Sequence, residues 1–219
     1  ISKACTNLPS GLVNSRDKAD YKSGEYREDK KLEQIHLLLG FEGVDYHHDD
    51  FYSLLVYSSL LGGGMSSRLF QEIREKRGLC YSIGTSFDCY SDNGIFLSYA
   101  GTSGDKVKEL SEVIATEFKD SITTINETEV ERAKTQLRSS LLMGLENSSS
   151  RSERLARGLI IWDKIVEVQE TISKIDSVNL EDVRDFGVEM FHNSYPAMAL
   201  YGQVKDALDV NQFSQKLMN

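Results

Sequence analysis

The run of residues 62–82, GGGMSSRLFQEIREKRGLCYS, limits the possible folds of this chain more than any other stretch. Three glycines precede a charged segment, Gly78 follows it, and Cys-Tyr then opens an apolar stretch. Gly78 suits the left-handed conformation just past a helix end, and Leu79 can fold back onto the last turn. The run predicts a helix from about residue 66 that reverses direction and leads into a strand.

One apolar stripe marks this helix. Met65, Leu69, Ile73 and Arg77 recur at four-residue spacing, and Phe70 stands beside them. Residues at that spacing share one helix face. We expect this stripe to pack inward on an otherwise charged cylinder.

Strands and helices are predicted along the rest of the chain. LEQIHLLLGFEGV indicates a buried strand, DDFYSLLVYSSLLGG a helix buried on most faces, and Ser-Asp-Asn-Gly a hairpin turn between two strands. GDKVKELSEVIATEFKDSI is an amphipathic helix, and Asn126 with Glu129 forms a capping box for one long helix or two broken near residues 147–150. Residues 179–192 predict another helix and PAMALYGQV a final strand. Residues 1–30 are polar and predict a connecting segment.

This order of elements predicts an α+β fold, a mostly antiparallel sheet packed against helices. The net charge of -9, from 25 Lys and Arg against 34 Asp and Glu, argues against a general nucleic-acid binder. A local basic patch remains, made of Arg68, Arg74, Lys76 and Arg77. No apolar run approaches the roughly 20 residues of a membrane span, so no membrane partner is expected.

The three cysteines, Cys5, Cys80 and Cys89, are an odd number without C-x-x-C spacing. One extended strand would hold Cys80 and Cys89 about 30 Å apart, too far to bridge. Free thiols in a reducing compartment are expected, which fits the cytoplasm and the mitochondrial matrix alike.

No complete catalytic set stands in the sequence. None of His36, His47, His48 and His192 lies in H-E-x-x-H or H-x-x-E-H spacing. We expect His47 and His48 to lie in a solvated turn before an acidic helix start, with a metal site as the alternative, and His36 to be a hydrogen-bonded core residue. There is no G-x-S-x-G elbow and no P-loop, and Cys80 is expected in the core.

Arg74 and Tyr81 flank the predicted reversal, so both polar tips can reach one small volume. A guanidinium and a phenol placed together can donate hydrogen bonds to a carbonyl or a developing oxyanion. A surface arginine with an interior tyrosine that caps the sheet is the alternative. Gly62, Gly63 and Gly64 offer bare backbone that another chain can approach closely.

The stretches LEQIHLLLGFEG, LLGGGMSSRLFQEIREKRGLCYSI and SDNGIFLSYAGT closely resemble the second half of the pitrilysin/insulinase family of zinc metallopeptidases. The likeness spans roughly residues 24–204 and is greatest to a bacterial branch similar to mitochondrial processing peptidase. It implies two homologous α+β halves that close around a peptide. The first half carries H-x-x-E-H and a distal Glu for zinc and base. The second half contributes an Arg and a Tyr, which fall here on Arg74 and Tyr81, and Gly62–Gly64 become candidates for substrate binding.

This resemblance implies the C-terminal half of a zinc metalloendopeptidase that cleaves peptides or presequence-like segments. Zinc belongs to the parent protein and none to this chain, which alone is expected to be inactive. Residues 1–23 would be the end of a preceding half and a linker, and residues 24–219 the non-zinc domain, so that the chain is a fragment. Expected partners are the zinc-binding half, in the same chain or as a separate subunit, a peptide substrate and possibly a second copy. The bacterial character favours the cytoplasm. An inactive partner subunit or a peptide-binding module is the alternative.

Overall fold

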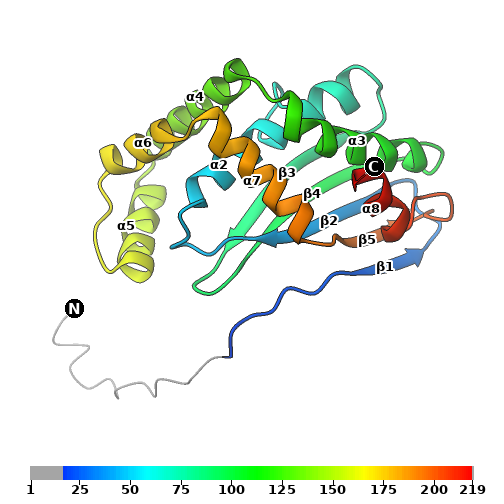
Figure 1. The fold of residues 1–219 in the computed structure, drawn as a ribbon, viewed down its shortest axis with the longest axis horizontal. Helices are drawn as coiled ribbons and strands as arrows, with labels where there is room; N and C mark the ends of the chain where they lie inside the picture. The colour runs from blue at the N-terminus through cyan, green and yellow to red at the C-terminus, as the bar shows by residue number, and fades with distance from the viewer. Residues whose placement is uncertain (1–16, 219) are drawn as a thin grey trace.

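A computed structural model of the protein describes residues 17–218. It contains a five-stranded sheet in the order β1-β5-β2-β4-β3 and a set of helices (Figure 1). The elements are β1 (Gly24–Asp29), β2 (Ile35–Gly43), α2 (Phe51–Gly62), η1 (Phe70–Glu75), β3 (Ser82–Cys89), β4 (Gly94–Thr102), α3 (Val107–Thr124), α4 (Glu127–Gly144), α5 (Ser148–Trp162), α6 (Val168–Ser177), α7 (Leu180–Asn193), β5 (Ala197–Gly202) and α8 (Val210–Met218).

Strand β2 lies at the centre of the sheet and pairs antiparallel with both β4 and β5. The β3–β4 hairpin turns at residues 90–93, where the Tyr90 N–H donates to the Asn93 carbonyl at 2.8 Å, and it places β3 on one outer edge. The hairpin was predicted, but Gly94 already pairs in β4, so Asn93-Gly94 is not the turn itself. On the other edge β1 pairs parallel with β5. The expectation of a mostly antiparallel α+β fold is confirmed.

The helices cover one face of the sheet and leave the other face open (Figure 1). Burial along β2 therefore alternates: Ile35, Leu37, Leu39 and Phe41 are buried, while the residues between them face the open side. Aromatic side chains of the sheet and helices pack edge to face in the core, with Phe41 and Phe118 ring centroids 5.9 Å apart. Helix α2 is buried on most faces, as predicted.

Three elements differ from the expectations. Residues 24–29 form strand β1 rather than a connecting segment, because an edge strand needs little apolar character when only one neighbour pairs with it. Helices α6 and α8 were not predicted. For the helical stretch that begins at Asn126, the alternative of two helices is correct. Asn147 separates α4 from α5, because its side chain caps α5 by accepting hydrogen bonds from the Ser149 and Ser150 N–H groups.

Cys80 and Cys89 are free and buried, as expected, whereas Cys5 and most of the expected linker lie outside the described residues. Within residues 17–218, no helix is both long enough and apolar enough to cross a membrane.

Candidate functional site

The charged helix begins one turn later than its apolar spacing suggests. Gly64 to Ser67 form a turn closed by the Ser67 N–H donating to the Gly64 carbonyl, and the helix follows it. Leu69 and Ile73 are fully buried, as predicted. The prediction for Met65 was wrong: its side chain is 74% exposed, because the residue precedes the helix.

The reversal at Gly78 has the predicted geometry. Gly78 has φ +60°, the left-handed conformation that glycine adopts without a steric penalty. The Leu79 N–H donates to the Ile73 carbonyl at 3.0 Å, and the Leu79 side chain is buried. This hydrogen bond spans six residues, which matches the π-helical winding of η1. Short π-helical segments are frequent at functional sites. The chain then continues toward β3 in the opposite direction.

Arg74 and Tyr81 both face solvent on either side of this reversal. Tyr81 is 72% exposed and immediately precedes edge strand β3, so the alternative of an interior tyrosine was wrong. Its backbone is fixed, because the Tyr81 N–H donates to the Gly101 carbonyl at 2.9 Å. Among residues 17–218, neither the Arg74 guanidinium nor the Tyr81 hydroxyl has a hydrogen-bond partner, so both are free to donate.

Two neighbours define the surroundings of Arg74. Its guanidinium carbon lies 4.6 Å from the centroid of the Phe70 ring, a cation–π contact that holds the side chain along the helix. Burial raises the pKa of the Cys80 thiol to about 11, although the positive charge of Arg74 acts in the opposite direction. Cys80 is therefore a protonated core residue and not an activated nucleophile.

A partly buried ion pair holds the start of this helix. Arg68 Nε and Nη2 donate to the two carboxylate oxygens of Glu129, each at 2.7 Å. Glu129 also completes the predicted capping box with Asn126 at the start of α4. The helix that carries Arg74 is thus tied to α4 at its beginning and to the sheet at its end.

The three glycines have packing reasons inside the chain. A Cβ on Gly62 would lie 2.4 Å from the Thr85 backbone nitrogen, and one on Gly63 would lie 2.7 Å from the Ser59 carbonyl oxygen. Gly64 is covered by the Gln136 side chain, whose Nε2 donates to the Gly63 carbonyl at 2.6 Å. Close approach within the fold accounts for Gly62 and Gly63, and their contact with substrate stays a prediction.

The histidines contribute no metal site. The His48 Nδ1 accepts a hydrogen bond from the Asp50 N–H at 3.1 Å in an exposed turn, so the solvated turn was correct. His36 is hydrogen-bonded as predicted, to the Tyr99 hydroxyl at 2.9 Å, but it lies on the open sheet face and not in the core. The described residues contain no group of three or more His, Cys, Asp or Glu side chains able to hold a metal ion. They therefore do not provide a zinc site.

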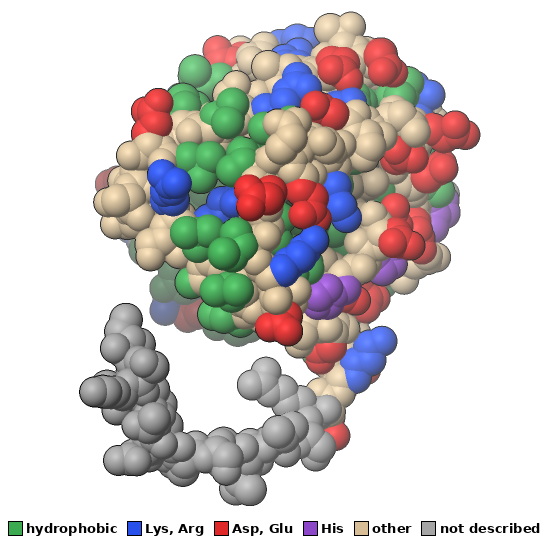
Figure 2. Space-filling view, turned by 90° about the vertical axis from the view of Figure 1, so that its left-hand side faces the viewer, with side chains coloured by type: hydrophobic (Ala, Val, Ile, Leu, Met, Phe, Trp, Pro, Cys, Tyr) green, Lys and Arg blue, Asp and Glu red, His purple; other side chains and the backbone are tan. Residues whose placement is uncertain are grey.

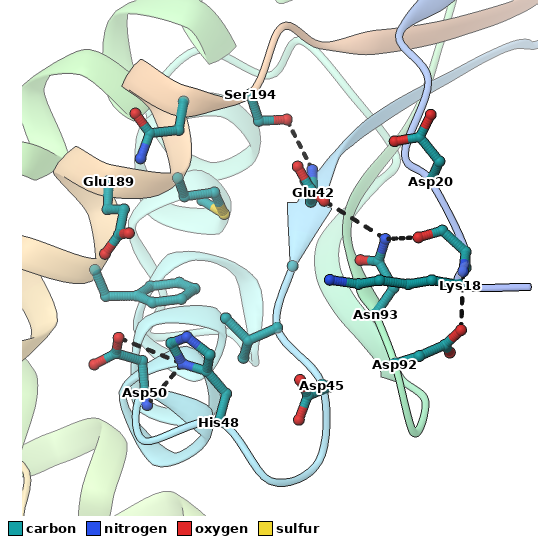
Figure 3. A pocket seen from close by; sticks show the side chains of 16 residues that line it. Lys18, Asp20, Glu42, Asp45, His48, Asp50, Asp92, Asn93, Glu189 and Ser194 are labelled. Atoms are coloured by element: carbon teal, nitrogen blue, oxygen red, sulfur yellow. Dashed lines mark hydrogen bonds and ion pairs between the residues drawn. The ribbon is translucent and has the colours of Figure 1, made fainter.

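A pocket of about 450 Å³ lies at the other end of the β3–β4 hairpin (Figure 3). Its wall is acidic and includes Asp20, Glu42, Asp45, Asp50, Asp92 and Glu189. Sequence reasoning missed it, because the carboxylates come from segments far apart in the chain. Tyr81 precedes the first residue of β3 and the pocket adjoins the turn after its last, so the two are separate features.

Residues 7–137 match the family model described as the peptidase M16 inactive domain. The chain belongs to this family. It is 36% identical over 194 residues to the uncharacterized zinc protease YmxG of Bacillus subtilis and 38% identical over 198 residues to an uncharacterized zinc protease of Rickettsia felis. These alignments cover 87% and 90% of this chain but 46% and 48% of the relatives. This peptidase M16 inactive domain thus spans about half the length of the curated relatives it matches.

Solved structures share the fold of this peptidase M16 inactive domain. A chain of complex III2 from Candida albicans with Inz-5 bound superposes with a TM-score of 0.86 at 20% identity, over 98% of this chain and 54% of that one. A conserved protein from Enterococcus faecalis superposes with a TM-score of 0.72 at 21% identity, over 89% and 44%. The resemblance to a zinc peptidase family is confirmed, and the roles of Arg74 and Tyr81 stay predictions.

Proposed function

We propose that this domain is the non-zinc half of a zinc metalloendopeptidase and that Arg74 and Tyr81 hold and polarise the peptide to be cleaved. The zinc proteases among its relatives, about twice its length, support the first part. Zinc and a general base would come from the other half, since the described residues offer no metal cluster.

One observation carries the assignment of roles: two exposed donors without a partner in residues 17–218 flank the reversal that leads into edge strand β3. Tyr81 directly precedes β3, whose outer side has no neighbouring strand among the described residues, and the Tyr81 backbone is fixed to β4. A substrate carbonyl that approaches this edge would meet the Tyr81 hydroxyl and the Arg74 guanidinium. Such donors stabilise the negative charge that develops on a carbonyl oxygen under attack.

The test is cleavage of a quenched fluorescent presequence-like peptide, with zinc present. This chain is assayed alone, then mixed with a polypeptide that bears the H-x-x-E-H half. We expect activity only in the mixture. Arg74→Ala and Tyr81→Phe should each lower kcat/KM by about 10²–10³-fold, the usual effect of removing one oxyanion donor.

Matched variants separate these roles from general damage. Arg132 is an exposed arginine on α4, and Tyr90 is a 58% exposed tyrosine after the other end of β3. Arg132→Ala and Tyr90→Phe should leave kcat/KM within about twofold, because surface changes away from a site have small effects. Equal losses in both pairs of variants would remove the proposed roles of Arg74 and Tyr81.

A second candidate is a catalytically inactive partner subunit that binds peptides. The description of the family model as an inactive domain favours it. Peptide binding by this chain without cleavage in any mixture would support this candidate, and the coding sequence upstream of Ile1 would then lack H-x-x-E-H.

A further inference from the structure

We infer that the exposed aliphatic surface of α4 and α5 is where the other half of the peptidase docks, an inference that rests on the proposed two-half function. We call this surface the aliphatic face. Its side chains come from the end of α4, from α5 and from the loop after α5, and they are between 39% and 82% exposed: Leu142, Met143, Leu155, Leu159, Ile160 and Ile165. Figure 2 shows hydrophobic side chains gathered on this end of the molecule.

Helix α5 is secured on one side only. Gly158 is its single buried residue. Trp162 packs edge-on against Tyr46, with ring centroids 6.0 Å apart, and Arg157 Nη2 donates to the Tyr46 hydroxyl at 2.9 Å. The opposite side presents Leu155, Leu159 and Ile160 to solvent. Because α5 buries so little surface, its contacts with the rest of the domain contribute little to its stability, and its apolar side is exposed to solvent.

Two exposed tyrosines on the open sheet face have a different chemistry. On the open sheet face, Tyr26 and Tyr99 are exposed, but their hydroxyls bond to Glu28 and His36 at 2.8 and 2.9 Å. A tyrosine side chain can be exposed to water because its hydroxyl is polar, whereas the side chains of the aliphatic face carry no polar group of this kind. Exposed aliphatic side chains gathered on one end of a molecule mark protein–protein contact, and permanent interfaces are the more apolar class.

The length of the relatives and the path of the chain before β1 indicate which partner covers the aliphatic face. The relatives carry as much chain again as they share with this domain, so a partner of similar size is expected in the whole protein. The segment before β1 passes the β3–β4 hairpin, where the Ala19 N–H donates to Asp92 at 2.9 Å. The same hairpin contributes Asp88 and Cys89 to a groove of about 280 Å³ beside α5. The described chain thus enters the domain at the hairpin end that borders α5.

The experiment mixes this chain with the separately expressed H-x-x-E-H half and measures the dissociation constant by sedimentation velocity. Leu159→Glu places a charge in the aliphatic face at a 51% exposed position. The control, Met218→Glu, places a charge outside that face, at a 52% exposed position on α8. We expect Leu159→Glu and Ile160→Glu each to weaken binding by about tenfold or more, as for central interface residues. Met218→Glu should bind like the wild type. Circular dichroism melts verify that each variant is folded.

Each outcome decides a distinct question. Wild-type binding that persists unchanged in folded Leu159→Glu and Ile160→Glu overturns the docking face and leaves the proposed function standing. No binding of the wild-type chain overturns the two-half function and the docking face together. A dimer of this chain alone that Leu159→Glu dissociates, without an effect on the other half, assigns the face to a second copy and overturns the inference.

Discussion

At Gly62 the end of α2 touches the backbone of β3, and a single methyl group cannot fit. Its Cβ would lie 2.4 Å from the Thr85 nitrogen and 2.8 Å from the Gly84 carbonyl carbon, neither of which can rotate away. We expect Gly62→Ala to lower the free energy of unfolding by about 1–3 kcal/mol, the usual cost of overpacking.

The matched control for this prediction is Gly144, the last residue of α4, where a Cβ would meet nothing within 4 Å. Gly144→Ala should be neutral or stabilise by up to about 1 kcal/mol, because alanine is the better helix former. Urea unfolding measures both. An equal response of the two variants would contradict the packing account of Gly62.

Because two thiols are buried, we expect the free energy of unfolding to fall at alkaline pH. Burial raises the pKa of both Cys80 and Cys89 from 9.0 to about 11, with Asp45 and Asp88 adding to the rise at Cys89. The folded state therefore retains protons that the unfolded chain releases first. This contribution is fully present below pH 9 and is lost as pH rises toward 11. Urea unfolding between pH 8 and 11 should show this decline, and it should be shallower in Cys89→Ala. A decline of equal slope in that variant would assign it to other groups.

Among elements, the tie between the helix of Arg74 and α4 rests on Arg68 and Glu129. Their side chains are only 13% and 15% exposed, so the bidentate pair is poorly screened by solvent. A double-mutant cycle with Arg68→Ala and Glu129→Ala should give a coupling energy of about 1–3 kcal/mol. The exposed pair Lys164–Glu170 should give less than about 0.5 kcal/mol. Similar couplings in both cycles would show that burial does not strengthen the first pair.

The elements also show what could be predicted from the sequence. Gly78, Leu79 and the place of the β3–β4 hairpin were predictable because each depends on the local sequence. The Asn-Gly pair marked the hairpin without forming its turn, since Gly94 is the first residue of β4. Strand β1 was not, because its sequence GEYRED is polar and only pairing with distant β5 makes it a strand. The environment of Gly62 was likewise hidden, since Thr85 approaches it only in the folded chain. Arg74 and Tyr81 were selected by family resemblance, whereas spacing alone favoured a surface arginine with an interior tyrosine.

Across the whole molecule, stability should be unevenly distributed. The central strand β2 has both neighbours in place and a fully buried inner face, whereas α5 buries only Gly158. Native-state hydrogen exchange should therefore show α5 amides opening with a far lower free energy than β2 amides. Addition of the H-x-x-E-H half should slow exchange in α5. Protection of α5 equal to that of β2 in the isolated chain would contradict this distribution.

The position of β5 has a consequence for synthesis on the ribosome. β5 is the last strand within residues 17–218, yet it lies between β1 and β2, the first two strands of that part of the chain. Until residue 202 has left the exit tunnel, β1 has no partner and one side of β2 stays unpaired. Pairing across such long sequence separation is slow, and unpaired strand edges invite aggregation. The nascent chain therefore depends on shielding of its central strand, by a chaperone or by the tunnel itself, until β5 has been synthesised.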